Sequence, residues 1–184
     1  YDEFENLIFN GSSIGRNILG DAKHLRKYRS EDAINFVSRN YCTDQIVFFS
    51  LGNVDFKKIV KWSELYFGAI PEKRKTICRE VPQECQPIYR TIKKRVSQSH
   101  TMMGAYAYGL HSDKRLPLYL LNNVLGGPGM NSKFNLALRE RAGLVYSVES
   151  GLTSYSDCGL LSIYFGSDEK NRDYCQELIF KELK

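Results

Sequence analysis

Two side chains with complementary chemistry, the guanidinium of Arg139 and the phenol of Tyr146, stand seven positions apart in this sequence. A guanidinium binds carbonyl or carboxylate oxygens through paired N–H groups, and a phenol donates a hydrogen bond to an oxygen that gains negative charge. The residue types alone also fit an alternative, in which Arg139 pairs with a neighbouring acid on the surface and the ring of Tyr146 lies in the core. The pair is a candidate site only if the surrounding elements present both groups to an open surface.

Residues 125–146 predict a bend, a short helix and the start of a strand. The bend cannot be regular helix or strand because it consists of Gly126, Gly127, Pro128 and Gly129. Either Asn131 or Ser132 can cap the helix that follows, which has one apolar face made of Phe134, Ala137 and Leu138. Gly143 ends this helix and Val145 begins an extended segment, so Arg139 and Tyr146 are expected on adjoining elements.

The length of 184 residues fits one large domain or two small ones, and 42% hydrophobic residues are enough for a core. No apolar run is long enough to span a membrane. The net charge of +5 comes partly from basic clusters at 57–58, 73–75 and 93–95. Nucleic-acid binding would need such clusters on one face, with interleaved aromatic residues or a known motif, and neither is evident. We therefore interpret them as solvated lysines and arginines and expect no nucleic-acid partner.

The five cysteines are odd in number and lack a C-x-x-C spacing: Cys42, Cys78, Cys85, Cys158 and Cys175. Disulfides are thus not expected to hold the fold, which favours a reducing compartment such as the cytoplasm. The three histidines, His24, His100 and His111, stand singly and form no zinc-ligand spacing. We expect no metal bound within this chain.

The first part of the chain, residues 1–70, predicts a helix–strand–helix unit. Ser30 is expected to cap the first helix, an apolar run at 46–51 has the length of a strand, and Asp55 is expected to cap a second helix that Gly68 ends. Residues 71–87 contain three prolines and little periodicity, so they are predicted to link two packed units.

Residues 88–184 predict an α+β unit. Extended segments are expected at 88–96 and 101–110, followed by a helix that starts near Pro117 and by the bend and helix described above. Two strands at 145–154 and 159–166 form a predicted antiparallel pair, and a last helix starts near Asn171. These elements predict an antiparallel sheet with helices covering one face.

Two long segments resemble the insulinase-type zinc peptidases, the family that includes pitrilysin and the mitochondrial processing peptidase. One runs from SSIGRNILG to LYFGAIP, and the other reads LLNNVLGGPGMNSKFNLALRERAGLVYSVESGLTSYSDCGLLSIYFGSD. The resemblance covers most of residues 15–168 and implies two α/β units of a repeated domain, each an antiparallel sheet covered by helices. The first unit would be truncated at its N-terminus and the second at its C-terminus.

The resemblance implies that the parent protein hydrolyses peptide bonds with a zinc-bound water. This chain lacks the family's zinc motif, His-x-x-Glu-His, so zinc would belong to the parent and none to this segment. The family encloses extended peptides between two half-shells, and Arg139 and Tyr146 match the arginine and tyrosine that face the zinc. The glycine bend, with Gly126, Gly127, Gly129, Asn131 and Ser132, resembles a flexible substrate-contacting loop. An ordinary turn without a binding role fits these residues equally well. A phosphate-binding loop is disfavoured because the Walker spacing is absent.

The leading hypothesis is therefore the non-zinc portion of a zinc metalloendopeptidase. Its partners would be a peptide substrate, added as a strand to a sheet edge, and a missing N-terminal zinc-bearing domain or partner subunit, with a homodimer as a further arrangement. The alternative is a non-catalytic family member that acts as a scaffold or partner subunit, as in respiratory-complex core proteins.

Overall fold

The computed structural model describes residues 1–74, 80–82 and 86–184. The chain divides into two compact units. One combines Tyr1–Ile18 with Glu80–Lys184, and the other is Leu19–Arg79. Cys78, Cys85 and part of the predicted linker 71–87 lie outside the described residues.

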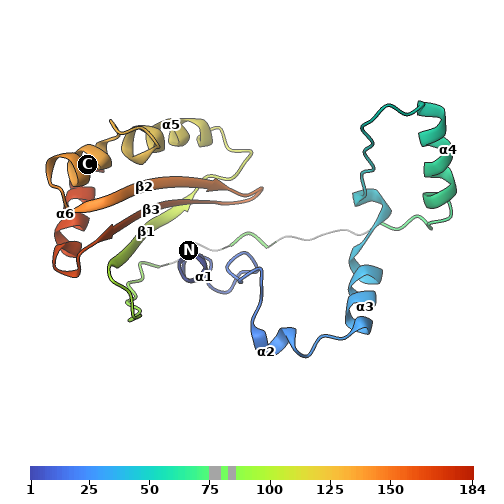
Figure 1. Cartoon of the computed structure of the whole chain (residues 1–184), viewed down its shortest axis with the longest axis horizontal. Helices are drawn as coiled ribbons and strands as arrows, with labels where there is room; N and C mark the ends of the chain where they lie inside the picture. Colours follow the sequence, from blue (N-terminus) through green and yellow to red (C-terminus); the bar gives the residue numbers. More distant parts are fainter. Residues whose placement is uncertain (75–79, 83–85) are drawn as a thin grey trace. The chain divides into compact units, whose positions relative to one another are not determined.

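The larger unit is built on a three-stranded antiparallel sheet in the order β1-β3-β2. The strands are β1 (Ser99–Ala107), β2 (Val145–Ser154) and β3 (Gly159–Ser167). The predicted antiparallel pair at 145–154 and 159–166 is confirmed as β2 and β3, and β1 adds to the other side of β3 (Figure 1). The combination of this sheet with helices confirms the predicted α+β class.

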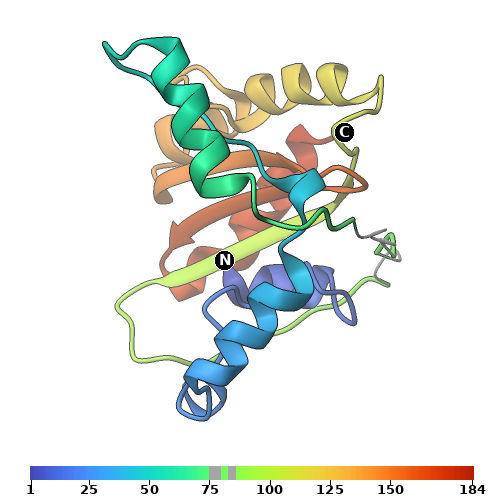
Figure 2. The ribbon, with the colours of Figure 1, turned by 90° about the vertical axis from the view of Figure 1, so that its right-hand side faces the viewer.

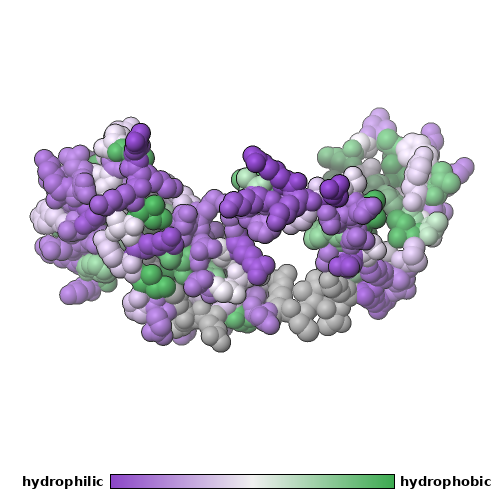
Figure 3. Space-filling view, turned by 90° about the horizontal axis from the view of Figure 1, so that it is seen from below, coloured by the Kyte–Doolittle hydropathy of each residue, from purple (hydrophilic) through white to green (hydrophobic). Residues whose placement is uncertain are grey.

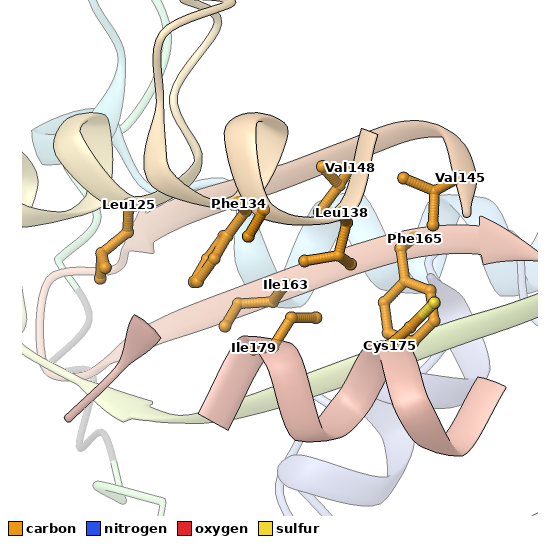
Figure 4. Close-up of a cluster of buried hydrophobic side chains, with 10 residues drawn as sticks. Leu125, Phe134, Leu138, Val145, Val148, Ile163, Phe165, Cys175 and Ile179 are labelled. Carbon is orange, nitrogen blue, oxygen red and sulfur yellow. The ribbon is translucent and has the colours of Figure 1, made fainter. Parts of the chain in front are cut away.

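Helices cover both faces of the sheet, which differs from the single covered face that the sequence predicts. On one face lie α5 (Arg115–Gly126), the π-helix η2 (Asn135–Arg141) and, after the short η3 (Glu169–Asn171), α6 (Arg172–Glu182). The helix α1 (Asp2–Ile8) lies on the opposite face (Figures 1 and 2). The larger core cluster joins the first set to the sheet (Figure 4): Leu125, Phe134, Ala137, Leu138, Val145, Val148, Ile163, Phe165, Cys175 and Ile179.

A smaller cluster on the opposite face attaches the start of the chain to the sheet. Phe9 is fully buried and meets the rings of Tyr106 and Tyr155 edge-on, at centroid distances of 5.3 and 5.9 Å. The Tyr106 hydroxyl donates to the Ile8 carbonyl at 3.0 Å. In this structure the first 18 residues therefore pack with the second half of the chain. The boundaries 1–70, 71–87 and 88–184 concern the family repeat and remain a prediction.

The smaller unit contains helices but no sheet within its described residues. Its elements are α2 (Ala22–Leu25), α3 (Ser30–Asn40), η1 (Thr43–Gln45) and α4 (Phe56–Phe67). The predicted cap of α4 is confirmed, because Asp55 Oδ1 accepts from the Lys57 amide at 2.9 Å. The predicted Ser30 cap is wrong: α3 begins at Ser30 itself, and the Asp32 carboxylate accepts from the Arg29 amide at 2.8 Å.

The predicted strands at 46–51 and 88–96 do not form. A strand is stable only when another strand pairs with it, and the described residues offer no partner to either segment. The run at 46–51 is apolar on both sides, the pattern of a strand buried within a sheet. Its large side chains are instead exposed: Ile46, Val47, Phe48, Phe49 and Leu51. Figure 3 shows such green, apolar residues gathered on the surface of this unit.

Across the described parts of both units, no helix combines the length and apolar character that crossing a bilayer would require.

Candidate functional site

A β-bulge in β2 exposes the ring of Tyr146. Val145 pairs with Ser167 and Val148 pairs with Phe165, so two residues, Tyr146 and Ser147, stand opposite one residue of β3. The extra residue lets Val145 and Val148 both enter the core, where they are 7% and 4% exposed. Tyr146 is 83% exposed, so the alternative that buries its ring is wrong. Bulges commonly re-aim side chains beside active sites.

Arg139 extends from η2 near the same end of the sheet. The residues that precede Arg139 and Tyr146, Leu138 and Val145, belong to one buried cluster (Figure 4). The Arg139 side chain is 41% exposed, and its Nε lies 3.7 Å from Glu140 Oε1. An exposed ion pair at this distance is weak, so it leaves the guanidinium able to bind another oxygen. Within the part of the chain that the structure describes, no hydrogen bond joins the Arg139 guanidinium to the Tyr146 phenol.

The helix that carries Arg139 is a π-helix, whereas the sequence predicts only a short helix of ordinary type. The apolar face is confirmed, because Phe134, Ala137 and Leu138 are buried. Residues Asn135–Arg141, however, form a π-helix, a rare conformation that is frequent at functional sites. Gly143 ends it as predicted, with φ at +61°, and the Leu144 amide donates to the Leu138 carbonyl at 2.9 Å. No local signal in the residues distinguishes this π-helix from an α-helix.

Two glycines of the bend are buried and tightly packed. A Cβ on Gly126 would lie 2.6 Å from Phe134 Cδ2 and 2.7 Å from Ser150 Oγ. A Cβ on Gly127 would lie 2.7 Å from the Asn123 carbonyl oxygen. Neither glycine has a positive φ, so close approach explains both. They form the start of the segment 126–132, which we call the glycine loop.

The polar residues of the glycine loop divide into buried and exposed ones. Ser132 is 3% exposed, and its hydroxyl accepts from Asn135 Nδ2 at 2.9 Å. Asn131 and Gly129 are exposed. Of the five predicted substrate-binding residues, a peptide can therefore reach Gly129 and Asn131 in this conformation, whereas Gly126, Gly127 and Ser132 support the loop. A direct substrate contact by any of them remains a prediction.

Sequence reasoning missed a polar contact that joins α5, the helix before this loop, to the strand of Tyr146. Asn122 of α5 is 5% exposed, and its Nδ2 donates to the Ser150 carbonyl oxygen at 3.2 Å. The Ser150 hydroxyl donates in return to the Asn122 carbonyl oxygen at 3.2 Å. An asparagine within the apolar run LYLLNNVL was the available signal.

The described residues do not fit a zinc site. They contain no group of three or more potential metal ligands. Two of the histidines already have partners, since His24 contacts Asp21 and His100 Nδ1 lies 2.8 Å from the Tyr164 hydroxyl. Burial raises the pKa of the Cys158 and Cys175 thiols, which disfavours the thiolate needed for a metal ligand or nucleophile. We therefore assign no metal-dependent reaction step to the described residues of this chain.

The chain is similar to one known family and to several proteins that are named as zinc proteases. The family described as "Peptidase M16 inactive domain" matches residues 27–184. An uncharacterized zinc protease of Bacillus subtilis, YmxG, is 31% identical over 183 residues, which are 100% of this chain and 44% of that protein. The mitochondrial-processing peptidase subunit beta of Saccharomyces cerevisiae is 26% identical over 199 residues, with 100% of this chain and 43% of that protein covered. The chain thus spans less than half the length of these relatives.

Solved structures show the same fold. A peptidase M16 inactive domain from Pseudomonas fluorescens aligns with a TM-score of 0.83 and 20% identity, covering 99% of this chain and 45% of that one. A chain of Complex III2 from Candida albicans aligns with a TM-score of 0.78 and 17% identity, covering 98% of this chain and 45% of that one. The resemblance drawn from the two sequence segments is confirmed.

Proposed function

Because this chain belongs to the peptidase M16 family through its inactive domain, we propose that it is the non-zinc portion of a zinc metalloendopeptidase. In this role it binds extended peptides and stabilises the transition state of their hydrolysis. The observation that carries the proposal is the bulge of β2, which turns Tyr146 outward while both flanking valines stay in the core.

The two side chains supply distinct interactions to a bound peptide. When a nucleophile attacks a peptide carbonyl, the oxygen gains negative charge, and the Tyr146 phenol donates a hydrogen bond to it. The Arg139 guanidinium binds a neighbouring carbonyl or carboxylate of the substrate through two N–H groups and so fixes its position. The rigid core beneath them, with Leu138 and Val145 packed in one cluster, limits the motion of both backbone positions.

The zinc-bearing part lies outside this chain in our proposal, either in the same polypeptide or in a partner subunit. The smaller unit supports this arrangement, because its strand-length run at 46–51 is exposed and unpaired among the described residues. Val47 and Phe49 alone are 91% and 79% exposed. Large apolar patches of this kind mark interaction surfaces, and a run that is apolar on both sides requires neighbouring strands.

The test uses the full-length protein, or the reconstituted complex if zinc resides on another subunit. Tyr146→Phe removes only the phenolic donor, and loss of one such donor lowers kcat by roughly 100- to 1,000-fold. Arg139→Ala should chiefly raise KM. Zinc content should remain at the wild-type level in both variants, because neither residue belongs to a zinc site.

Matched controls come from the same elements. Arg141→Ala removes a second exposed guanidinium from the same π-helix, and Tyr174→Phe removes a half-exposed phenol from α6. Both controls should retain wild-type kinetics. Unchanged turnover in Tyr146→Phe and Arg139→Ala would refute the roles assigned to these residues.

The second candidate, a scaffold or partner subunit without catalysis, is favoured by the absence of His-x-x-Glu-His from this chain. It predicts that the purified full-length protein holds no zinc and cleaves no peptide in any variant. Stoichiometric zinc with peptide cleavage would exclude it.

A further inference from the structure

A row of aromatic and polar side chains crosses the sheet on the face where α1 lies. The ring of His100 in β1 stacks on that of Tyr164 in β3 at a centroid distance of 6.0 Å, and His100 Nδ1 lies 2.8 Å from the Tyr164 hydroxyl. The Tyr164 ring also meets the ring of Tyr1 at 6.1 Å, and the Tyr1 hydroxyl donates to Glu149 Oε1 of β2 at 2.8 Å. The row thus connects the start of α1 with all three strands.

Helix α1 leaves one end of this face open. Its Phe4 packs on the middle of β1, since a Cβ on Gly104 would lie 2.6 Å from Phe4 Cζ. His100, near the start of the same strand, is exposed. The pair of His100 and Tyr164 therefore stands beside the covered part of the sheet, where a ligand can reach it.

The bulge of β2 lies at the same end of the sheet. Gly166 is the residue of β3 that stands opposite the bulge at 146–147, and it also pairs with His100 of β1. Because Phe165 belongs to the larger core cluster, Gly166 faces the other side of the sheet, as does a bulge between two buried valines. Adjacent strands lie about 4.8 Å apart, so the backbones of His100 and the bulge are about 10 Å apart across Gly166. An extended peptide spans this distance with about three residues.

Three polar atoms gather over Gly166. Apart from its chain neighbours, the heavy atoms nearest to the position of a Cβ on Gly166 are Gln98 Oε1 and the Tyr164 hydroxyl oxygen, both at 3.6 Å, and His100 Nδ1 at 3.8 Å. Either neutral tautomer of His100 leaves one donor in its pair with Tyr164: Nε2–H if the hydroxyl donates to Nδ1, or the hydroxyl itself if Nδ1–H donates to it. The amide of Gln98 adds an acceptor. The three side chains therefore offer a ligand both a donor and an acceptor without a formal charge.

The carboxylate that borders these side chains already has a partner. Glu149 stands opposite Tyr164 in the register of β2 and β3 and accepts from the Tyr1 hydroxyl. Partial burial and the hydrogen bond to Glu149 raise the pKa of Tyr1 to about 12, so this phenol keeps its proton at neutral pH. The negative charge of Glu149 disfavours an acidic ligand beside it, and its hydrogen bond to Tyr1 weakens its attraction for a basic one.

We propose that Gln98, His100 and Tyr164 form a polar subsite for an uncharged side chain of the peptide substrate, and that the carboxamide of glutamine or asparagine fits it best. This inference rests on the proposed peptidase function. A carboxamide contains a donor and an acceptor, so it matches both kinds of group that the subsite offers. The bound residue lies about three positions from the peptide bond that Tyr146 contacts.

The experiment measures which peptides the full-length protein prefers, or the reconstituted complex if zinc resides on another subunit. Fluorogenic peptides carry glutamine, methionine, glutamate or lysine at one position, which is scanned along the peptide. Methionine has nearly the length of glutamine but lacks its amide. About three residues from the cleaved bond, the glutamine peptide should have a kcat/KM roughly fivefold above that of the methionine peptide, mainly through KM, as one added hydrogen bond provides. The glutamate and lysine peptides should not exceed the glutamine peptide.

Variants of the subsite identify the residues responsible. His100→Phe keeps a ring but removes both nitrogens, so it should bring the ratio of glutamine to methionine close to one. Tyr164→Phe keeps the stacked ring and removes the hydroxyl that contacts His100, so it should lower the ratio as well. His111→Phe, which changes an exposed histidine in the segment after β1, is the matched control and should keep the wild-type ratio. Hydrogen exchange of β1 and β3 reports in parallel whether each variant keeps the sheet intact.

The outcomes separate this inference from the proposed function. If Tyr146→Phe loses turnover but no scanned position prefers glutamine, or His100→Phe keeps the wild-type ratio, the subsite alone is overturned. A preference for glutamate or lysine over glutamine at the responsive position would overturn the uncharged class of ligand. Wild-type turnover in Tyr146→Phe and Arg139→Ala would instead refute the proposed function. Because His100 is exposed, its variant tests the inference even if Tyr164→Phe fails to fold.

Discussion

Replacing Gly126 with alanine should destabilise the larger unit, because the added methyl has no space. Its Cβ would lie 2.6 Å from Phe134 Cδ2 and 2.7 Å from Ser150 Oγ. Phe134 is fully buried, and Ser150 is held by Asn122, so neither neighbour can swing away freely. Overpacking of this kind costs about 1–3 kcal/mol. The better helix propensity of alanine offsets part of that at the last residue of α5, which leaves a net loss of about 1–2 kcal/mol.

Hydrogen exchange of the full-length protein measures this effect locally. Amides of β3, the central strand, should exchange roughly 5- to 30-fold faster in Gly126→Ala, since each 1.4 kcal/mol corresponds to a factor of ten. Gly151→Ala is the matched control on β2, because the atom nearest to its added methyl is Ser162 Oγ at an ordinary 3.5 Å. Exchange in the control should match the wild type or slow slightly.

A double-mutant cycle identifies the clash itself. Phe134→Val removes the Cδ2 atom that lies closest to the added methyl, so the two substitutions together should cost less than the sum of their separate effects. Equal exchange rates in Gly126→Ala and Gly151→Ala would refute the packing argument. Simple additivity with Phe134→Val would show that another contact causes the loss.

Two further predictions concern pH and the smaller unit. Burial raises the pKa of the Cys175 thiol from its ordinary value of 9.0, so the folded state keeps a proton that the unfolded chain releases. The free energy of unfolding should therefore fall as the pH rises above about 9. Urea titrations should show a smaller fall in Cys175→Ala than in the wild type. An equal fall in the two proteins would contradict this prediction. Phe49→Lys should lower the thermal midpoint of the full-length protein if a partner strand covers residues 46–51, whereas an unchanged midpoint would mean that the run stays in water.

Local sequence signals predicted several elements of the fold correctly. Asp55 before α4 and Gly143 after the π-helix were recognisable because a side-chain cap and a left-handed glycine act within a few residues. Two extended segments separated by a short turn were enough to predict β2 and β3, because these strands pair with each other across that turn. The run at 46–51 had an equally strong pattern and still formed no strand, because a ladder needs a partner that the described residues do not contain.

The candidate site was predictable in identity but not in geometry. The spacing of Arg139 and Tyr146 was visible in the sequence, and so was the glycine bend. The bulge at 146–147 and the π-helix at Asn135–Arg141 were not, because both arise from how distant core residues fit together. The role of Asn122 depends on Ser150, 28 positions away, and no local pattern reports such a contact.

The bulge also has a consequence for how this strand tolerates changes in length. Side chains of a regular strand alternate, so the outward orientation of Tyr146 depends on the number of residues between two buried valines and not only on the identity of the tyrosine. Losing a single codon between Val145 and Val148 would leave one residue opposite Gly166, and strict alternation would still place both valines on the buried face. Deletion of the exposed Ser147 should therefore leave the core intact, whereas a further inserted residue would send one of the two valines to the exposed face.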